Sequence, residues 1–352
     1  MILRSLSSLN YRNLEPGKLE LRAGLTAIVG GNGQGKTNVL EAIFLCLTGV
    51  LDVSRVETTI KIGEREAHIG AELEREDGIS KLEVGLAPGK KLARVDGARV
   101  RSSELARHAS AVLIRPEDAD LVHGSPSTRR AFLDALVARM SPRYAQALQL
   151  YERTLSQRNA ILRHHEQAGT SSLEIWDARL IELGTEIMKL RRRAIGRLRD
   201  LASEAHTSLA ANGKTLEINL IESAPLETFT QDLQHKRREE LARGTTAIGP
   251  HRDDLEIKLA GLAAVDYASR GEARTIALAL RKAEFDLFEE KFGEAPVLLI
   301  DDFTAELDGF RRGFLLELAA HTPQAIITGT EAPANVTRLY KIEAGKLERV
   351  QP

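Results

Sequence analysis

The chain has 352 residues, which is enough for two or three domains with sizeable hydrophobic cores. It is 43% hydrophobic and 28% charged, and its 49 basic side chains nearly balance 50 acidic ones, so bulk charge indicates neither a nucleic-acid binder nor a membrane-surface binder. The single cysteine, Cys46, excludes disulfides within the chain.

The first 28 residues alternate apolar and polar positions, as in LELRAGLTAIVG, and this pattern predicts short strands. The N-terminus lacks the basic start and long apolar run of a signal peptide. No stretch of the sequence approaches the roughly 18 apolar residues of a membrane span. We therefore expect a soluble, cytoplasmic protein without membrane partners.

The next segment reads GGNGQGKT and matches the phosphate-binding pattern G-x-x-x-x-G-K-[ST] in full. It lies between a predicted strand and an apolar-faced helix that ends at Gly49, whereas a chance glycine-rich turn would lack this context. We predict an ATP site in which Lys36 neutralises the β- and γ-phosphates and the Thr37 hydroxyl ligates Mg²⁺. The expected nucleotide-binding residues of this loop are Gly30, Gly31, Asn32, Gly33, Gln34, Gly35, Lys36, Thr37 and Asn38.

Short strand patterns return over residues 56–101, and from Pro116 the sequence becomes rich in Arg, Leu and Ala. Apolar residues recur every three or four positions over 173–201, which predicts one long amphipathic helix. A second helix is expected from residue 142 to about 165, with QAGTSS as the turn. These two helices should form an antiparallel pair.

Strand and helix patterns alternate again from TLEINLIES to the end of the chain, with helices expected over 272–291 and 309–321. The predicted fold class is therefore α/β, with a P-loop on a mixed sheet and a helical insertion that splits the sheet domain in two. The expected domains are residues 1–114 and 246–352 as the two halves of the head and residues 115–245 as a mainly helical insertion.

The stretch APVLLIDD predicts a buried strand that delivers Asp301 and Asp302 to the carboxyl edge of the sheet, where ligands collect in open α/β folds. Asp301 would hold Mg²⁺, and Asp302 would lie one step nearer the attacking water. The predicted catalytic residues are Lys36, Asp301 and Asp302, and the predicted metal ligands are Thr37 and Asp301. A carboxylate-capped turn is the alternative explanation of the two acids.

The stretch ASRGEARTIALALRKAE opens a helix with Ser269, Gly271 and Glu272, whose backbone N–H groups could hold an anion. A second anion site is superfluous beside a single P-loop. Its simplest use is to touch the γ-phosphate of a nucleotide on another copy, so that two nucleotides are sandwiched between two subunits. The alternative is a well-capped helix, with Ser269 or Glu272 bonded to its amides.

Residues 121–200 carry 14 Arg and Lys against 8 Asp and Glu. On paired helices these cations could line a groove that follows DNA phosphates, or they could be paired with acids of their own unit. Few aromatics accompany them, which favours contacts to the backbone of duplex or gapped DNA over base stacking. The cations considered are Arg129, Arg130, Arg143, Arg153, Arg158, Arg163, Lys189, Arg191, Arg192 and Arg193. The block GPHRDD lacks metal-ligand spacing and predicts a hydrogen-bonded turn near the nucleotide.

The order of these motifs resembles the ABC-type ATPase heads of chromosome-maintenance proteins, and the sequence is most similar to the RecF family of recombination mediators. The resemblance rests on GGNGQGKTNVLEAI, RPEDADLVHGSPSTRRAFLDAL, YERTLSQRNAILR, IGPHRDDLEI, YASRGEARTIALALRKAE and LLIDDFTAELDGFRR, which span most of the chain in one order. It implies that Ser269 and Gly271 belong to the signature motif and that residues 305–308 form the loop that meets a partner subunit. Arg12 and Asn13 resemble residues that approach the nucleotide in related heads.

The sequence departs from the wider ABC pattern in three places. Asp302 stands where the catalytic base is usually Glu, and the shorter carboxylate predicts slow hydrolysis. Thr328 or Thr330 occupies the region of the usual switch histidine, and Glu117 or Asp118 that of the usual Gln.

The resemblance implies a weak, DNA-dependent ATPase that dimerises around ATP at single-strand/double-strand boundaries and promotes recombinase loading with recombination mediator partners. The nucleotide-binding subunit of a membrane transporter shares the head and is the alternative, although the helical insertion disfavours it. A third interpretation is an ATP switch that binds without hydrolysing. Substitution of Asp302 separates this switch from a hydrolysing clamp.

Overall fold

The computed structural model describes residues 1–51, 55–76, 78–164, 173–210, 213–304 and 309–351. They fall into two compact units, one formed by Met1–Asp118 with Ala277–Pro352 and the other by Ala119–Ile276. The sequence placed its domain boundaries at 114/115 and 245/246. The observed division falls at 118/119 and 276/277, and residues 254–259 pair as a strand with residues 216–221 inside the second unit.

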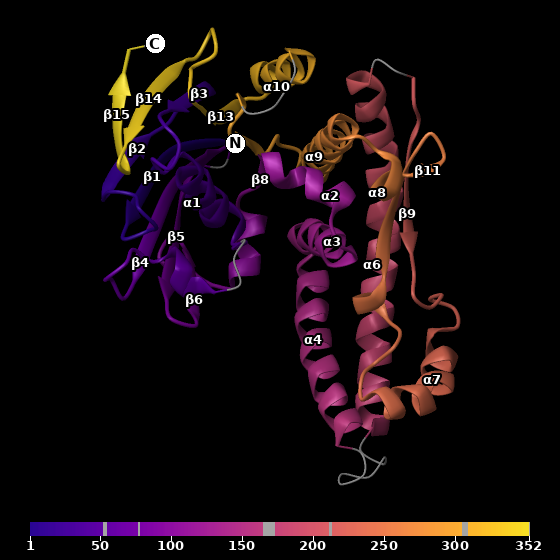
Figure 1. Ribbon diagram of the computed structural model, residues 1–352. Coiled ribbons are helices and arrows are strands. Elements are labelled where there is room, and N and C mark those ends of the chain that lie inside the picture. Colours follow the sequence, from indigo (N-terminus) through magenta and orange to yellow (C-terminus); the bar gives the residue numbers. More distant parts are fainter. Residues whose placement is uncertain (52–54, 77, 165–172, 211–212, 305–308, 352) are drawn as a thin grey trace. The chain divides into compact units, whose positions relative to one another are not determined.

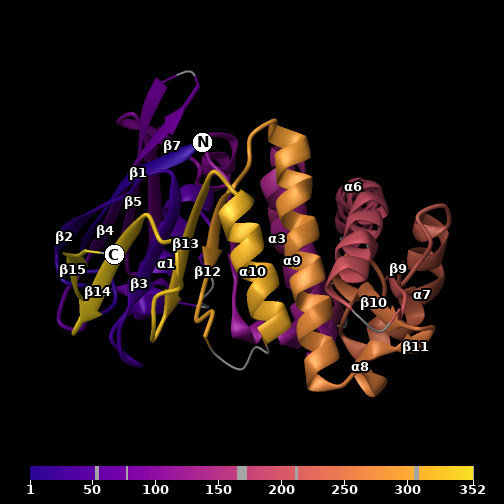
Figure 2. The ribbon, with the colours of Figure 1, turned by 90° about the horizontal axis from the view of Figure 1, so that it is seen from above.

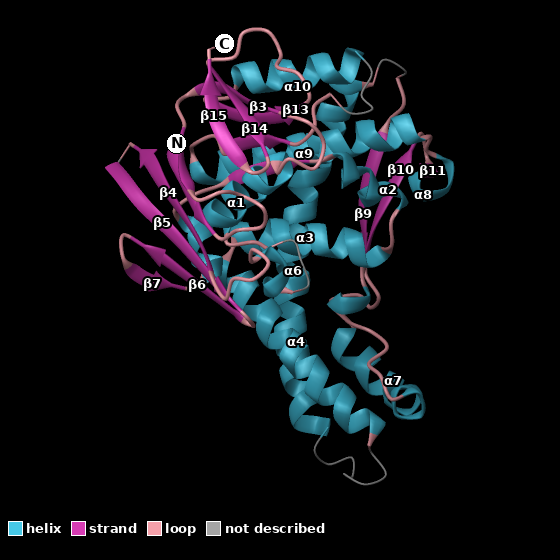
Figure 3. Ribbon diagram, turned by 60° about the vertical axis from the view of Figure 1, so that its left-hand side comes forward, coloured by secondary structure: helices cyan, strands magenta, loops and turns pink. Residues whose placement is uncertain are grey.

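The first unit contains an antiparallel sheet with the strand order β2-β1-β4-β5-β6-β7. Along β4, buried positions alternate with more exposed ones, as expected for a sheet with one face on the core. Its strands are β1 (Ile2–Leu9), β2 (Gly17–Glu20), β4 (Ala67–Arg75), β5 (Gly78–Ala87), β6 (Lys90–Val95) and β7 (Ala98–Val100). Figure 3 shows these strands side by side.

A second, mixed sheet of the same unit has the order β15-β14-β3-β13-β12-β8 and carries the P-loop. Strands β14, β3, β13, β12 and β8 run parallel, and β15 is antiparallel to β14. Every residue of β8, β12 and β13 is buried, which explains their nearly continuous apolar sequences. The strands are β3 (Gly24–Val29), β8 (Ala111–Ile114), β12 (Val297–Ile300), β13 (Gln324–Gly329), β14 (Arg338–Glu343) and β15 (Lys346–Val350).

Helix α1 (Lys36–Thr48) contacts strands of both sheets and contributes to one core with them. Most of its residues are buried, and the more exposed Thr37, Glu41 and Phe44 recur at helical spacing along one side. Cys46 is completely buried there and donates to Leu82 O at 3.6 Å. The helix ends at Gly49 in a left-handed conformation, which confirms the end predicted from the sequence.

Short 3₁₀ segments and two longer helices complete the first unit. Helix α10 contacts β3 and β13, and it lies beside α9 in the view from above (Figure 2). The division between the units falls inside α9, which is one continuous helix. These elements are η1 (Val56–Thr59), η2 (Ser102–Arg107), η3 (Pro116–Ala119), α9 (Arg270–Phe292) and α10 (Gly309–His321).

The second unit is mainly helical, and its largest helices, α4 and α6, pack side by side (Figure 1). The 37 residues of α6 span about 55 Å at the usual helical rise, and this helix confirms the long amphipathic pattern. The expected turn QAGTSS lies outside the described residues. A small sheet ordered β11-β10-β9 also belongs to this unit. The elements are α2 (Asp120–His123), α3 (Pro126–Met140), α4 (Pro142–Arg163), α6 (Leu173–Leu209), β9 (Leu216–Ile221), α7 (Phe229–Arg243), η4 (Pro250–Arg252), β10 (Asp254–Leu259), β11 (Leu262–Ala263) and α8 (Ala264–Tyr267).

Two buried arginines form a polar core inside the helical unit. The completely buried Arg158 donates to Asp177 Oδ1 at 2.7 Å and Glu240 Oε2 at 2.6 Å. Arg191, 1% exposed, donates to Asp134 Oδ1 at 2.6 Å and to Asp253 Oδ2 at 3.1 Å. Because a buried charge is costly unless it is paired, these groups fix the positions of the helices they join.

The GPHRDD segment joins the same network. Tyr151 Oη lies 2.7 Å from His251 Nδ1, and Arg191 donates to the Pro250 carbonyl at 2.6 Å. Burial lowers the pKa of His251 to about 4, so its ring is neutral near pH 7. The segment is a hydrogen-bonded 3₁₀ turn inside the helical unit.

We expect Arg158→Met to destabilise the helical unit by about 3–5 kcal/mol, because it leaves the buried Glu240 carboxylate without its cation. Asp177 loses one of its two cations and keeps its pair with Arg237. Denaturant titration followed by circular dichroism measures the loss. Arg179→Met is the matched control: its pair with Glu182 is exposed, and its removal should cost less than about 1 kcal/mol. Equal midpoints for the two variants would contradict the role of the buried pair.

Candidate nucleotide site

The P-loop connects β3 to α1 and takes the backbone conformation that its glycines permit. Gly33 and Gly35 have φ angles of 76° and 107°, in the left-handed region that side chains disfavour. The first turn of α1 has neither a side-chain cap nor an acidic residue. Its N–H groups and the positive end of the helix dipole therefore form an anion-binding cradle.

Lys36 lies at the centre of this cradle. Its side chain is buried, and Nζ donates to the carbonyl oxygens of Gly30 at 2.7 Å and Gly31 at 2.8 Å. The ammonium is therefore held inside the loop, where it can neutralise bound phosphate oxygens.

Asp301 is held by two threonines from different segments. Thr37 Oγ1 donates to Asp301 Oδ2 at 2.8 Å, and Thr328 Oγ1 donates to Asp301 Oδ1 at 2.6 Å. The completely buried Thr328 hydroxyl also accepts the N–H of Asp302 at 2.9 Å. Thr328 thus fixes both acids at the end of β12. The sequence had indicated only that Thr328 or Thr330 lies in the region of the usual switch histidine, not this positioning role.

Asp302 has a φ angle of 45°, which is uncommon for a residue other than glycine. Aspartate tolerates this conformation because its short side chain can bond locally, and here Oδ1 accepts the Thr304 hydroxyl at 2.9 Å. Thr330 Oγ1 lies 3.4 Å from Thr304 Oγ1. Thr304 was missed from the sequence because a hydroxyl two residues after an acid carries little signal.

The tip of the P-loop is braced from two sides. Asn38 Nδ2 donates to Asn13 Oδ1 at 2.7 Å, and the Ala344 N–H donates to Gln34 Oε1 at 2.6 Å. Arg12 forms an ion pair with Glu41 of α1 at 2.8 Å. Asn13 therefore lies against the loop, and an approach of Arg12 and Asn13 to the nucleotide stays a prediction.

These residues surround a pocket that is open to solvent. Its lining residues are Asn32, Gly33, Gly35, Lys36, Thr37, Asn38, Asp301 and Asp302. The described residues contain no group of three or more His, Cys, Asp or Glu side chains that could hold a metal ion by themselves. Thr37 and Asp301 instead fit Mg²⁺. This ion is usually held by few protein oxygens together with the phosphate oxygens of a bound nucleotide.

The predicted second anion site lies at the start of α9, and its side chains form a capping box. Glu272 Oε2 accepts the Ser269 N–H and the Ser269 hydroxyl, both at 2.9 Å, and the Glu272 N–H donates to Ser269 Oγ at 3.2 Å. The capping alternative therefore describes this helix start in the single chain. Gly271 follows in the first turn of α9, and the partner-meeting loop, residues 305–308, lies outside the described residues.

The two acids in the region where ABC-type heads usually have a Gln, Glu117 and Asp118, differ in their surroundings. Asp118 is buried and receives two hydrogen bonds from Arg281 of α9, at 2.6 and 3.0 Å. Glu117 is exposed. Asp118 therefore joins the end of β8 to α9.

Most of the arginines considered for a DNA groove are bonded to their own unit. Composition alone therefore overestimates the number of cations available to such a groove. Arg158 and Arg191 are buried, Arg129 forms a two-pronged pair with Asp254 at 2.8 Å, and Arg130 donates to the Asp253 carbonyl at 2.8 Å. The buried Arg129, Arg158 and Arg191 cannot line a groove, because their guanidinium groups are used internally, whereas Arg130 is half-buried. Arg192 is paired with Glu222 and Glu227, both at 2.6 Å. The cations with exposed side chains are Arg143, which pairs with Glu186 at 2.6 Å, and Arg153, Arg163, Lys189 and Arg193.

Fold and site together define a P-loop ATPase head with a helical insertion. The family model described as "RecF/RecN/SMC N terminal domain" matches residues 2–343. A protein of Deinococcus deserti named "DNA replication and repair protein RecF" is 55% identical over 98% of this chain and 95% of its own length. Its namesake in Deinococcus radiodurans is 53% identical over 99% of the chain and 96% of its own length. The chain belongs to the RecF family, which confirms the resemblance seen in the sequence.

The fold agrees with solved structures. One of them, described as "Structure of the recombination mediator protein RecF-ATP in RecFOR pathway", superposes with a TM-score of 0.92 at 31% identity, covering 99% of this chain and 98% of that one. The Smc head domain of Pyrococcus furiosus, 19% identical, superposes with a TM-score of 0.55 over 99% of this chain and 96% of its own, and shares the fold. The predicted ABC-type head split by a helical insertion is thereby confirmed.

We expect Thr328→Val to lower the free energy of unfolding by about 1–3 kcal/mol, because the buried Asp302 N–H and Asp301 Oδ1 lose their partner without a change in side-chain volume. Thr328→Ser keeps the hydroxyl and should preserve most of the stability. Thermal unfolding of the three proteins measures the difference. A valine variant as stable as the serine variant would show that the hydroxyl does not hold the two acids.

Proposed function

We propose that this chain is an ATP-dependent DNA-binding protein of recombinational repair. It dimerises around ATP on DNA at single-strand/double-strand boundaries and promotes recombinase loading, with slow hydrolysis. The observation that carries the proposal is the combination, on one chain, of a P-loop joined to Asp301 through Thr37 and a separate helix start at Ser269. The names of the relatives support it, as does the similarity to a structure solved as RecF-ATP.

ATP would bind with its phosphates in the P-loop. Lys36 would move from the Gly30 and Gly31 carbonyls to the β- and γ-phosphate oxygens. Thr37 and Asp301 would hold Mg²⁺, which when bound neutralises developing phosphate charge. Asp302 would orient the attacking water. Because its carboxylate is short and already accepts a bond from Thr304, we propose weak, DNA-dependent hydrolysis suited to timing.

The start of α9 would contact the γ-phosphate held by a second copy of the chain. Ser269, Gly271 and Glu272 would form this contact: the Gly271 N–H would reach the phosphate, while the N–H groups of Ser269 and Glu272 remain in the capping box. A dimer of this kind has two equivalent nucleotides, because a two-fold axis repeats each contact. The dimer would therefore form with ATP and loosen after hydrolysis.

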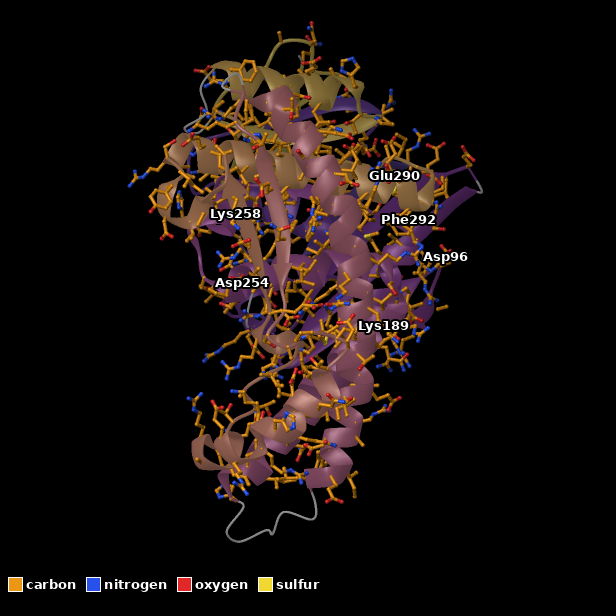
Figure 4. All side chains as sticks on the ribbon, turned by 90° about the vertical axis from the view of Figure 1, so that its right-hand side faces the viewer. Asp96, Lys189, Asp254, Lys258, Glu290 and Phe292 are labelled. Carbon is orange, nitrogen blue, oxygen red and sulfur yellow. The ribbon has the colours of Figure 1, made fainter. Side chains whose placement is uncertain are left out.

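DNA would bind through the exposed cations of the helical unit. Arg143, Arg153, Arg163, Lys189 and Arg193 are exposed on α4 and α6, and Lys189 is marked on α6 in Figure 4. Such side chains contact phosphates and position a protein without reading sequence. We propose backbone contacts to duplex or gapped DNA and action in the cytoplasm with recombination mediator partners.

The transporter alternative is weaker for this chain. The family match and the high identity both run through the helical insertion, which that alternative leaves unexplained. The described residues also contain no helix that is long and apolar enough to cross a membrane.

We expect the mass measured by light scattering to double with ATP·Mg²⁺ and not with ADP·Mg²⁺. Ser269→Arg should bind one ATP per chain yet remain monomeric, because the larger side chain blocks the start of α9. Lys36→Ala should lose both nucleotide binding and dimerisation. A wild-type chain that stays monomeric in ATP, or a Ser269→Arg chain that dimerises normally, would refute the cross-subunit contact.

We expect Asp302→Asn to slow hydrolysis by about 100-fold or more, because the amide cannot accept the proton of the attacking water. The variant should bind ATP normally and remain on gapped DNA longer than the wild type. Phosphate release and the decay of fluorescence anisotropy after addition of competitor DNA measure the two effects. Unchanged residence on DNA would favour the non-hydrolysing switch.

A further inference from the structure

The capping glutamate of α9 is held from two sides. Glu272 Oε2 accepts both the N–H and the hydroxyl of Ser269 at 2.9 Å, and Glu272 Oε1 accepts Lys214 Nζ at 2.5 Å. The Lys214 ammonium is the largest cause of a Glu272 pKa lowered to about 2, so the carboxylate is ionised throughout the neutral range.

Lys214 is located by the end of α6. It precedes β9, and its backbone is hydrogen-bonded to the ring of His206, which is 1% exposed in the last turn of α6. Burial lowers the pKa of His206, so this ring is neutral near pH 7 and adds no charge of its own. His206, Lys214 and Glu272 thus connect α6 to the helix start at Ser269.

The pair has a consequence for an anion that approaches this helix start. A glutamate in the first turn of a helix stabilises the free helix, but it repels a multiply charged triphosphate. Lys214 neutralises the negative charge of the Glu272 carboxylate by direct pairing. The side chains of Lys214 and Glu272 are 44% and 20% exposed, and pairs this close to solvent contribute little to folding.

We propose that Lys214 is a positioning residue of the ATP-bridged interface: it neutralises Glu272, so that the triphosphate held by a second copy can approach Ser269. This inference rests on the proposed function. It assigns to the segment between α6 and β9 a role in dimerisation, although that segment contains no part of the P-loop or of the signature motif.

Lys214→Gln tests the inference by light-scattering titration in ATP·Mg²⁺, with binding of a fluorescent ATP analogue to the single chain measured in parallel. We expect nucleotide binding to be unchanged and the dimer to be weakened roughly tenfold at each site, hence roughly a hundredfold for two equivalent sites. Lys214→Arg keeps the charge and should dimerise like the wild type.

The double variant Lys214→Gln, Glu272→Gln tests whether the unpaired charge of Glu272 is what weakens the dimer. Glutamine keeps the capping box but has no charge, so the double variant should recover dimerisation to within a few-fold of the wild type. Lys236→Gln, which breaks a similarly exposed pair with Glu239 on α7, is the matched control and should have no effect.

Two outcomes would overturn the inference alone: a Lys214→Gln chain that dimerises like the wild type, or a double variant that does not recover. A wild-type chain that stays monomeric in ATP would instead refute the proposed function and this inference together. Thermal unfolding of each variant shows whether the chain is folded.

Discussion

The carboxylate of Asp301 is the point on which the nucleotide site depends. It follows β12, and its two oxygens accept hydrogen bonds from the hydroxyls of Thr37 in α1 and Thr328 in β13. One side chain therefore joins two strands of the mixed sheet and the helix that follows the P-loop. The contact is possible because parallel strands bring their carboxyl ends to one edge. The P-loop, Asp302 and Thr328 all derive their positions from this edge.

Local patterns in the sequence predicted much of this arrangement. The P-loop reads as a phosphate cradle because glycine spacing and the lysine define its backbone, and the structure has that cradle followed by α1. The periodicity of residues 173–201 likewise predicted α6, because a helix needs only local bonds and one apolar stripe. Strand patterns indicated an α/β fold but not that β2 and β3, neighbours in sequence, belong to different sheets.

Long-range pairing was beyond the reach of the sequence. Arg158 looked like a candidate for DNA contacts, yet Asp177 and Glu240, far away in sequence, enclose it completely. Composition cannot separate a buried arginine from an exposed one, since both occur on charged helices. The same reason hid Lys214, whose role follows from a partner that approaches it only in the folded chain. Part of the basic surface expected from composition, Arg158 and Arg191, is instead the polar core that joins the helices of the second unit.

The burial of Cys46 has a practical consequence for chemical labelling. The thiol lies inside α1 without solvent exposure, and burial raises its pKa to about 12, so it is present as the unreactive thiol at neutral pH. Because the sequence has no other cysteine, a cysteine introduced on the surface would be the sole reactive thiol of the native chain. Fluorophores, spin labels and cross-linkers can then be attached at one chosen position in the otherwise natural sequence. The core that supports the P-loop thereby leaves the protein suited to distance measurements in solution.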